Sequence, residues 1–270
     1  SGEFRTMKVT TLGDGAPAVA IVAAVHGDEP AGLRPIERLV EEDPAVRRPV
    51  KLIVANERAL ERNVRFVDED LNRAFPGSPD GDTHEKRLAA KLAAELDGCT
   101  TLSIHSTQSH GEPFAVAHRL VDPVRNLVPR LPVTALIETG DFVQGRLFEA
   151  VERLVEVEAG RQGTERAAEN ADRIARAFLA ATGVLPGHTP SCELPVFRLT
   201  GEIPKAPADR YEVFAENFEP VAAGEAFAAA DGVETVADDP FYPVLMSPEG
   251  YADVYGYEAD RVGTIGGTGR

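Results

Sequence analysis

His26 and Glu29 are the residues whose types and spacing most clearly suggest chemistry. They lie three positions apart in a turn that directly follows the apolar run of residues 18–25. Zinc accepts an imidazole nitrogen and a carboxylate oxygen, and two ligands from one turn need one more from elsewhere to leave a catalytic position open. Gly27 supplies the backbone freedom that such a turn needs. The alternative is a surface histidine followed by a glutamate whose charge favours a helix N-terminus.

His105 and Glu138 also follow directly on segments that we expect to be buried strands. His105 comes after residues 100–104, and Glu138 comes after residues 133–137. Open α/β sheets bind ligands at the carboxyl ends of their strands. We therefore expect a zinc site of two imidazoles and one carboxylate at this rim, with Glu138 as a further carboxylate beside it. Taken singly, a hydrogen-bonded histidine and a salt-bridged acid at two strand ends remain alternatives.

Strands and helices alternate over the first two thirds of the chain. Hydrophobic periodicity predicts the strands 7–12, 18–25, 50–55, 100–104, 114–117 and 133–137, and the helices 30–42, 82–98, 124–128 and 164–181. Asp82 and Glu85 have the spacing of a capping box at the start of one helix. The pattern predicts an α/β fold with a mixed, mainly parallel sheet flanked by helices.

Two regions depart from this alternation. Residues 56–75 show neither a helical nor a strand period and are rich in Arg, Asn and Asp, which indicates a functional loop. From residue 191 onward, short alternating runs separated by Gly, Pro and Asp indicate β structure. We therefore predict a catalytic domain over residues 7–185 and a small β-rich domain over residues 186–270.

The composition narrows the classes of partner and compartment. The 270 residues carry a formal net charge of -16, which argues against a nucleic-acid-binding surface and suits a salt-adapted cytoplasm. No apolar run reaches the roughly 18 residues that a membrane span needs. Cys99 and Cys192 lie far apart and in no metal-binding spacing, which favours a reducing compartment. We expect a cytoplasmic protein, and a homo-oligomer stays open.

Four motifs, in this order along the chain, resemble those of the succinylglutamate desuccinylase/aspartoacylase family. The members of that family are zinc amidohydrolases related to carboxypeptidase A. The motifs are HGDE at residues 26–29, DEDLNR at 68–73, SIHST at 103–107 and IETG at 137–140. The resemblance runs from about residue 18 to residue 145. A weaker similarity follows in the C-terminal part, where Tyr242-Pro243-Val244 precedes Tyr251.

The resemblance implies a role for each motif residue. His26, Glu29 and His105 would bind one Zn²⁺ per chain. Glu138 would be the general base, taking a proton from the attacking water and returning it to the leaving nitrogen. Arg65 would polarise the scissile carbonyl and stabilise the oxyanion.

The resemblance also implies substrate contacts. Asn72 and Arg73 would bind the free carboxylate of the amino-acid part, since a planar guanidinium grips a carboxylate through two hydrogen bonds. Asp70 would orient an arginine or a zinc-binding histidine. Tyr251 is a candidate for a substrate contact and could equally be a core residue of the β-rich part.

The sequence departs from the family pattern at two places. Residues 56–59 read Asn-Glu-Arg-Ala, so a proline that stiffens the family's turn is missing. The arginine that recognises a second substrate carboxylate should lie shortly before Glu138. Arg125 and Arg130 lie upstream, and neither can be matched to it.

The expected reaction is zinc-dependent hydrolysis of the amide bond of a small N-acyl amino acid, of the N-acetylaspartate or N-succinylglutamate type. The expected partner is therefore a small molecule rather than a nucleic acid or a membrane. Two alternatives stay open. One is a zinc carboxypeptidase that trims C-terminal residues of peptides, and the other is a non-catalytic, metal-containing protein that binds an acidic metabolite.

Overall fold

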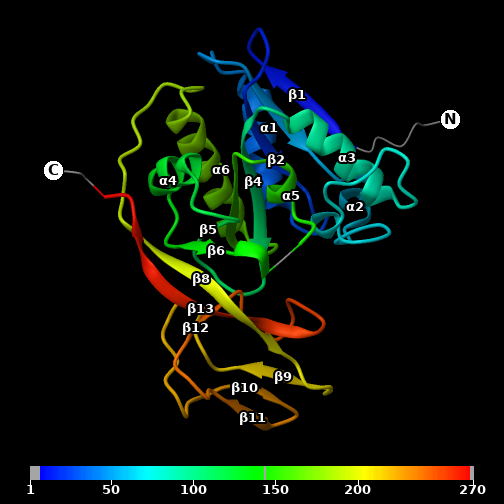
Figure 1. Cartoon of the computed structure of the whole chain (residues 1–270). Coiled ribbons are helices and arrows are strands. Elements are labelled where there is room, and N and C mark those ends of the chain that lie inside the picture. The colour runs from blue at the N-terminus through cyan, green and yellow to red at the C-terminus, as the bar shows by residue number, and fades with distance from the viewer. Residues whose placement is uncertain (1–6, 143, 268–270) are drawn as a thin grey trace.

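Two sheets organise the computed structural model, which describes residues 7–142 and 144–267 (Figure 1). The strands are β1 (Lys8–Leu12), β2 (Val19–Ala23), β3 (Val50–Val54), β4 (Thr100–Thr107), β5 (Phe114–Ala117), β6 (Leu136–Glu138), β7 (Leu154–Arg161), β8 (Leu194–Pro204), β9 (Tyr211–Val213), β10 (Ala226–Ala230), β11 (Val233–Val236), β12 (Tyr242–Val244) and β13 (Val254–Ile265). Within the described ranges, a ten-stranded sheet has the order β1-β3-β2-β4-β7-β5-β6-β8-β13-β12, and a three-stranded sheet has the order β11-β10-β9.

Helices cover both faces of the large sheet. The α-helices are α1 (Leu33–Glu42), α2 (Glu57–Arg62), α3 (His84–Leu96), α4 (Asp122–Leu127), α5 (Leu147–Ala150) and α6 (Glu165–Ala181). The 3-10 helices are η1 (Pro30–Gly32), η2 (Leu71–Arg73), η3 (Val128–Arg130) and η4 (Gly140–Phe142). One core contains side chains of α1, α4 and α6, and a second core on the opposite face contains side chains of α3 and α5.

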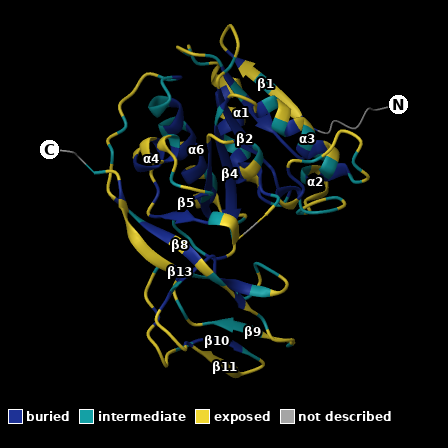
Figure 2. Cartoon of the chain, in the orientation of Figure 1, coloured by how far each residue is buried: buried dark blue, intermediate teal, exposed yellow. Residues whose placement is uncertain are grey.

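Strand β2 shows why this arrangement follows from the sequence. All its residues are buried, and they alternate between the two cores: Val19 and Ile21 face one, while Ala20 and Val22 face the other. A strand covered on both faces must be apolar throughout, which is why it reads as an unbroken hydrophobic run. The central strands are accordingly buried along their length (Figure 2). β2 pairs in parallel with both β3 and β4, so their carboxyl ends meet at one edge.

The sheet changes direction beyond β7. β4 and β7 are parallel, but β7 and β5 are antiparallel, and β5 and β6 are again parallel to each other. The carboxyl end of β6 therefore points to the edge opposite the carboxyl ends of β2 and β4. Strand β7 itself was not foreseen from the sequence.

The predicted fold class is confirmed, with one difference in how the C-terminal part is built. β8, β13 and β12 continue the large sheet, since β6 pairs with β8 and β8 pairs with β13. The separate antiparallel sheet of β9, β10 and β11 lies below it in Figure 1. A domain boundary at residues 185/186 stays a prediction, because strands from both sides of it join one sheet.

The start of α3 differs from the predicted capping box. Thr83, rather than Asp82, is the N-cap, and its side chain accepts a hydrogen bond from the backbone nitrogen of Lys86. Asp82 forms an ion pair with Lys86 at the surface. Glu85 is fully buried and turns away from the helix to bind a loop described below. A threonine hydroxyl can cap a helix in place of a carboxylate, which leaves the glutamate free to bind the loop.

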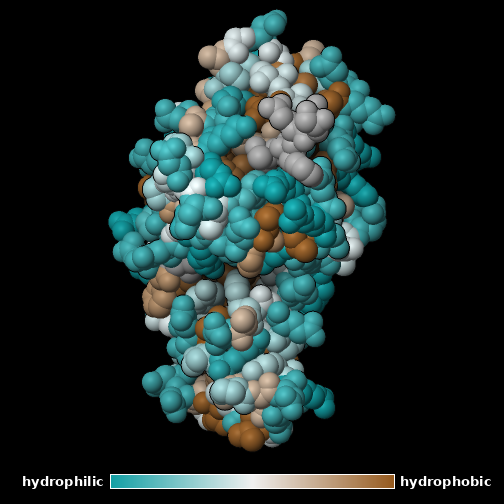
Figure 3. All heavy atoms as spheres, turned by 90° about the vertical axis from the view of Figure 1, so that its right-hand side faces the viewer, coloured by the Kyte–Doolittle hydropathy of each residue, from teal (hydrophilic) through white to brown (hydrophobic). Residues whose placement is uncertain are grey.

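The surface is largely hydrophilic on the face that carries α2 and α3, with small hydrophobic areas in its middle and at its lower end (Figure 3). The exposed apolar side chains include Val233 and Val236 on β11 and Phe214 after β9. In the described part of the chain, no helix has both the length and the hydropathy to cross a membrane.

The packing of α6 against the sheet yields a stability prediction. Phe178 is completely buried in the core that α1 and α6 share. Phe178→Ala should lower the free energy of unfolding by about 3–5 kcal/mol, since it removes buried contacts and leaves a cavity. Val40→Ala on α1 is the control, because Val40 is 40% exposed. Urea denaturation with equal midpoints for the two variants would contradict this packing.

Candidate metal centre

His26, Glu29 and His105 form a buried cluster at the carboxyl edge of β2 and β4. One ligand atom from each lies within 4.8 Å of the others, and this is the metal-binding arrangement of His, Cys, Asp and Glu found in the described residues. The Nδ1 atom of His26 lies 2.9 Å from Glu29 Oε1, and the Nδ1 atom of His105 lies 3.0 Å from Glu29 Oε2. The structure thus brings together the three side chains that the sequence proposed as metal ligands.

The backbone after β2 is shaped to bring His26 and Glu29 to this point. Ala24 has a positive φ of 54°, which turns the chain sharply away from the strand. Gly27 packs directly on the backbone of α2, where a Cβ atom would lie 2.1 Å from the carbonyl carbon of Ala59. Only glycine allows this approach. His105 reaches the same place from β4, because β2 and β4 are parallel neighbours.

The chemistry of this donor set fits a zinc ion. Two imidazoles and one carboxylate are the ligands of many catalytic zinc sites, which keep a fourth position open. The second nitrogen of each imidazole is also occupied: His26 Nε2 lies 2.9 Å from Asp70 Oδ1, and His105 Nε2 lies 3.0 Å from the hydroxyl of Ser103. Such partners fix the ring orientation and leave the Nδ1 atoms to face the cluster.

The charges in the cluster depend strongly on one another. Burial by itself would lower the pKa of His26, but the Glu29 and Asp70 carboxylates outweigh it and raise this pKa to about 9. Burial would raise the pKa of Glu29, but the two imidazoles hold it well below its usual range. Without a metal, the cluster therefore holds a proton on His26 at neutral pH, and a metal ion would have to displace it.

A cavity of about 260 Å³ opens in front of the cluster. Its walls come from the loops after β2 and β4, from η2 and from the segment between β12 and β13. The charged and polar side chains that line it include His26, Glu29, Arg65, Asn72, Arg73, His105, Arg146, Glu158 and Tyr251. Segments from both halves of the sequence thus enclose one site.

Glu158 is a carboxylate in this cavity that the sequence reasoning missed. It lies on β7 directly beside His105 of β4 in the sheet register. Its Oε2 atom is buried and has no hydrogen-bond partner in the described part of the chain. Burial, followed by repulsion from Glu29, raises its pKa to about 7. A carboxyl group with such a pKa can both accept and release a proton at neutral pH.

The expected position of Glu138 at this rim is wrong. Glu138 ends β6, which runs opposite to β4, so this strand end lies toward the other edge of the sheet. Phe114, at the start of β5, is level with Glu158, whereas Glu138 pairs with Ala117, three residues or about 10 Å further along β5. Its carboxylate accepts hydrogen bonds from Arg198 Nε at 2.6 Å and from the backbone nitrogen of Leu120 at 3.2 Å. Glu138 is therefore a salt-bridged acid at a strand end, which the sequence analysis gave as the alternative.

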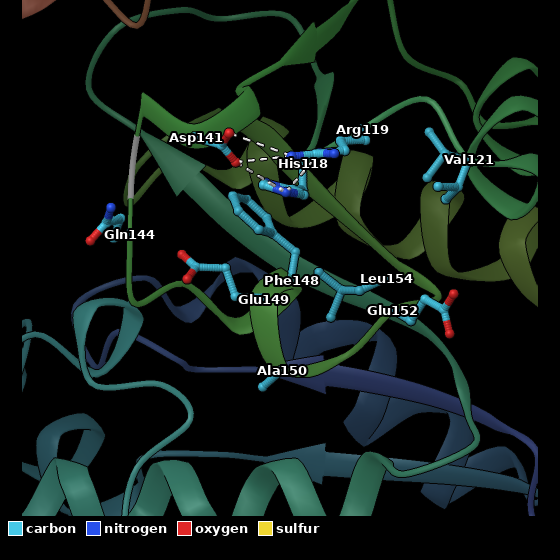
Figure 4. A pocket seen from close by; sticks show the side chains of 11 residues that line it. His118, Arg119, Val121, Asp141, Gln144, Phe148, Glu149, Ala150, Glu152 and Leu154 are labelled. Carbon is cyan, nitrogen blue, oxygen red and sulfur yellow. Dashed lines mark hydrogen bonds and ion pairs between the residues drawn. The ribbon is translucent and has the colours of Figure 1, made fainter.

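A second cavity, of about 590 Å³, lies where β5 and β6 end (Figure 4). His118 and Arg119 both point toward Asp141, with Arg119 Nη2 donating to Asp141 at 3.2 Å. The ring of Phe148 lies beside that of His118, with 5.5 Å between the ring centres. His26, Glu29 and His105 do not line this second cavity. The cavity of about 260 Å³ in front of them is therefore the candidate site.

The predicted loop of residues 56–75 delivers Arg65 and Asp70 to the cluster. Arg65 donates to Glu29 Oε1 at 3.2 Å and to Asp70 Oδ2 at 3.1 Å. Asp70 therefore contacts both His26 and Arg65, the two kinds of residue that the family resemblance implied. The loop is not fully irregular, since it contains α2 and η2.

Asn72 and Arg73 differ in what they face. The side chain of Asn72 is buried, accepting from the backbone nitrogen of Leu147 at 2.9 Å and lying 3.5 Å from Glu156. Arg73 is exposed and donates to the backbone oxygen of Asn72 at 2.7 Å. Arg73 is thus free to bind a ligand, whereas Asn72 holds η2 against its neighbours.

The comparisons with known proteins agree with this geometry. The family model of the succinylglutamate desuccinylase/aspartoacylase catalytic domain matches residues 15–182. The chain belongs to this family. Both the resemblance seen in the sequence and the predicted class of amide-hydrolysing enzyme are therefore confirmed. No curated protein matches this family member in sequence.

Solved structures share the fold of this family member. The product-bound ectoine utilization protein EutE (DoeB) from Ruegeria pomeroyi is 23% identical, with 96% of this chain and 88% of that chain covered and a TM-score of 0.77. A succinylglutamate desuccinylase from Silicibacter sp. TM1040 is 23% identical, with the same coverage and a TM-score of 0.74. Murine aminoacylase 3 is 19% identical, covering 93% and 98% of the two chains, with a TM-score of 0.72.

Three further residues can now be placed in this family member. Tyr251 lines the cavity and is partly buried. Arg125 and Arg130 do not line it, since their guanidinium groups donate to backbone oxygens near α4 and η3. A third arginine lines the cavity besides Arg65 and Arg73, namely Arg146, just before α5, which the sequence analysis did not name.

Glu85 anchors the loop that carries Arg65 and Asp70. Its buried carboxylate accepts hydrogen bonds from the backbone nitrogens of Val67 at 2.7 Å and Asp68 at 3.0 Å. It also accepts from the side chain of Asn56 at 3.1 Å. A charged acceptor shared by several donors stabilises the loop to which those donors belong.

Glu85→Gln should loosen this loop, because an amide places a donor where a backbone nitrogen of the loop needs an acceptor. A hydrogen bond to a charged acceptor is worth about 1.5–3 kcal/mol, so the amides of residues 67–69 should exchange hydrogen roughly tenfold faster or more. Hydrogen exchange with mass detection measures this. Glu61→Gln on the exposed side of α2 is the control. Unchanged protection of residues 67–69 in Glu85→Gln would remove the anchoring role.

Proposed function

We propose that this protein is a zinc-dependent hydrolase that cleaves the amide bond of a small N-acyl amino acid, releasing a carboxylate and the free amino acid. The observation that carries the proposal is the placement of Glu158, with an unpaired oxygen, in the same cavity as the His26, Glu29 and His105 cluster. A cluster of metal ligands and a carboxylate near neutral pKa are the two parts that amide hydrolysis by water requires.

The chain's own residues prepare the site for the metal. His26, Glu29 and His105 would hold the zinc ion, and Asp70 and Ser103 keep the two rings in place. When bound, zinc supplies a Lewis acid that polarises a carbonyl and lowers the pKa of water. Asp70 accepts from His26 Nε2, so Nδ1 is the atom that faces the cluster and would bind the metal once its proton has been displaced.

Glu158 is the proposed general base in place of Glu138. Its carboxylate would take a proton from the attacking water and deliver it to the leaving nitrogen. The pKa of about 7 suits both halves of this transfer. Burial and, after it, repulsion from Glu29 keep this pKa high, so the protein environment itself tunes the group.

Two arginines have separate proposed roles. Arg65, held by Glu29 and Asp70, presents its guanidinium at the cavity wall, where it would stabilise negative charge on the carbonyl oxygen. Arg73 would bind the carboxylate of the amino-acid part. Asn72 would position η2, and Tyr251 would contact the substrate from the C-terminal wall.

The shape of the cavity favours this reaction over a carboxypeptidase. A volume of about 260 Å³ suits a molecule of amino-acid size, and Leu245, Ser247 and Tyr251 form a wall that a peptide chain would have to displace. The unpaired Glu158 oxygen favours an enzyme over a metabolite-binding protein, because a binding protein gains nothing from a buried carboxylate without a partner.

The partner that this proposal names is a small molecule. A net charge of -16 opposes binding to nucleic acid. A cytoplasmic location remains a proposal, supported by the free thiols of Cys99 and Cys192.

Glu158→Gln should lower kcat/KM on an N-acyl amino acid by at least about a thousandfold, because it removes the proton carrier without changing the size of the side chain. Zinc content, measured by metal analysis, should stay near one per chain. Glu138→Gln is the matched control and should keep activity within a few-fold. Turnover by the wild type should also disappear after chelation and return with zinc.

The opposite ranking of these two variants would restore Glu138 as the base and overturn the role of Glu158. Hydrolysis of C-terminal peptides in preference to N-acyl amino acids by the wild type would instead favour the carboxypeptidase. Both results come from one panel of substrates and three purified proteins.

Zinc binding should release a proton and strengthen with pH. Because the folded metal-free protein has a His26 pKa of about 9, zinc must displace a proton at any lower pH. The apparent affinity should therefore rise by about tenfold per pH unit between pH 6 and 8. Competition against a chromophoric chelator measures this slope. An affinity independent of pH would show that zinc binds elsewhere.

A further inference from the structure

We infer that the substrate of this site carries a single carboxylate, so that its amino acid has a side chain without an acidic group and its acyl group is uncharged. The inference rests on the proposed function and narrows it. N-acetylaspartate and N-succinylglutamate, which the sequence suggested as substrate types, both carry more than one carboxylate. The argument comes from how the cationic side chains of the cavity are already engaged.

Among the described residues, three guanidinium groups line the cavity, those of Arg65, Arg73 and Arg146. Arg65 forms ion pairs with both Glu29 and Asp70. Its charge is therefore shared between two carboxylates of the protein. It can still donate a hydrogen bond toward a carbonyl oxygen, but it is not an uncompensated cation.

Arg146 is compensated more completely. Its Nη2 atom donates to Glu156 Oε1, and the two side chains are only 9% and 2% exposed. Glu156 lies on β7 two residues before Glu158, on the strand that borders β4. The guanidinium also lies over the ring of Phe148, 5.0 Å from its centre. Arg146 thus reaches the cavity as one half of a buried ion pair.

A second substrate carboxylate would have to compete for this arginine with Glu156. The interior is a medium of low dielectric constant, where like charges at short range repel strongly and a buried charge needs its own partner. A carboxylate at Arg146 would add a negative charge beside Glu156 and near Glu158. The internal pair therefore makes this wall unfavourable for an acidic side chain.

Arg73 is the remaining cation. It donates to the backbone oxygen of Asn72 and acts on the Asp70 carboxylate only from a distance, since no carboxylate of the described residues lies within ion-pair distance of it. One uncompensated guanidinium matches one substrate carboxylate. The other groups on the wall offer no further positive charge: Leu245, Ser247 and Tyr251 are uncharged, and Asp28 and Glu249 are acidic.

The test compares substrates that differ only in one charge. N-acetylasparagine is paired with N-acetylaspartate, and N-acetylglutamine with N-acetylglutamate, using the zinc-loaded full chain. The uncharged member of each pair should have a kcat/KM at least tenfold higher. A higher kcat/KM for the acidic member of both pairs would overturn the inference while leaving the proposed function intact.

A binding measurement keeps the two proposals distinguishable. Binding of free asparagine and aspartate to the zinc-loaded protein should favour asparagine, and calorimetry can show this without any turnover. If no member of either pair is hydrolysed, the proposed function fails, and this binding preference alone decides the inference. Tighter binding of aspartate would overturn it.

Glu156→Gln tests the cause of the preference. Removal of the compensating charge exposes Arg146 as a free cation, so the ratio of kcat/KM values should shift toward the acidic member by about tenfold or more. The readout is a ratio within one protein preparation, so a general loss of folded or active protein cancels. Glu152→Gln, at an exposed position before β7, is the matched control and should leave the ratio unchanged. An unchanged ratio in Glu156→Gln would show that Glu156 does not set the specificity.

Discussion

The carboxylate of Glu29, held between two buried imidazoles, is the interaction on which the rest of the site depends. It contacts His26 through one oxygen and His105 through the other. A buried ionised carboxylate needs partners that compensate its charge, either cations or hydrogen-bond donors. Arg65 adds a third cationic contact. The need to compensate this one group explains why side chains from β4, from the turn after β2 and from the loop before η2 converge at one point.

Charge compensation extends outward from this centre in an ordered way. Asp70 joins His26 to Arg65, and Glu156 joins Arg146 to Asn72. Arg65 and Arg146 thus each pair with a carboxylate of the protein. Glu158, in contrast, has an oxygen without a hydrogen-bond partner in the described part of the chain. The cavity therefore presents a proton-accepting carboxylate and few free cations. Because β7 carries both Glu156 and Glu158 and pairs with β4, one pair of strands supports the proposed chemistry and the proposed preference for a substrate with one carboxylate.

Much of the fold could be predicted from the sequence, because its strongest signals are local. The apolar run that became β2 and the amphipathic segments that became α1, α3 and α6 were found close to their true bounds. The turn residues His26 and Glu29 are only three positions apart, so their proximity could be predicted from spacing alone. Strand β7 escaped notice because its carboxylates at 156 and 158 interrupt the apolar run, although Leu154, Val155, Val157 and Ala159 are all buried.

The sequence by itself determined which residues end the buried strands and which family the chain belongs to, since both depend on local patterns and ordered motifs. Only the tertiary structure decided which strand ends meet. Hydrophobic alternation has the same period in parallel and antiparallel strands, so it cannot reveal that β6 runs opposite to β4. For this reason the sequence placed Glu138 at the site, whereas the direction of β5 and β6 carries Glu138 to Arg198 and the pairing of β7 with β4 leaves Glu158 beside His105.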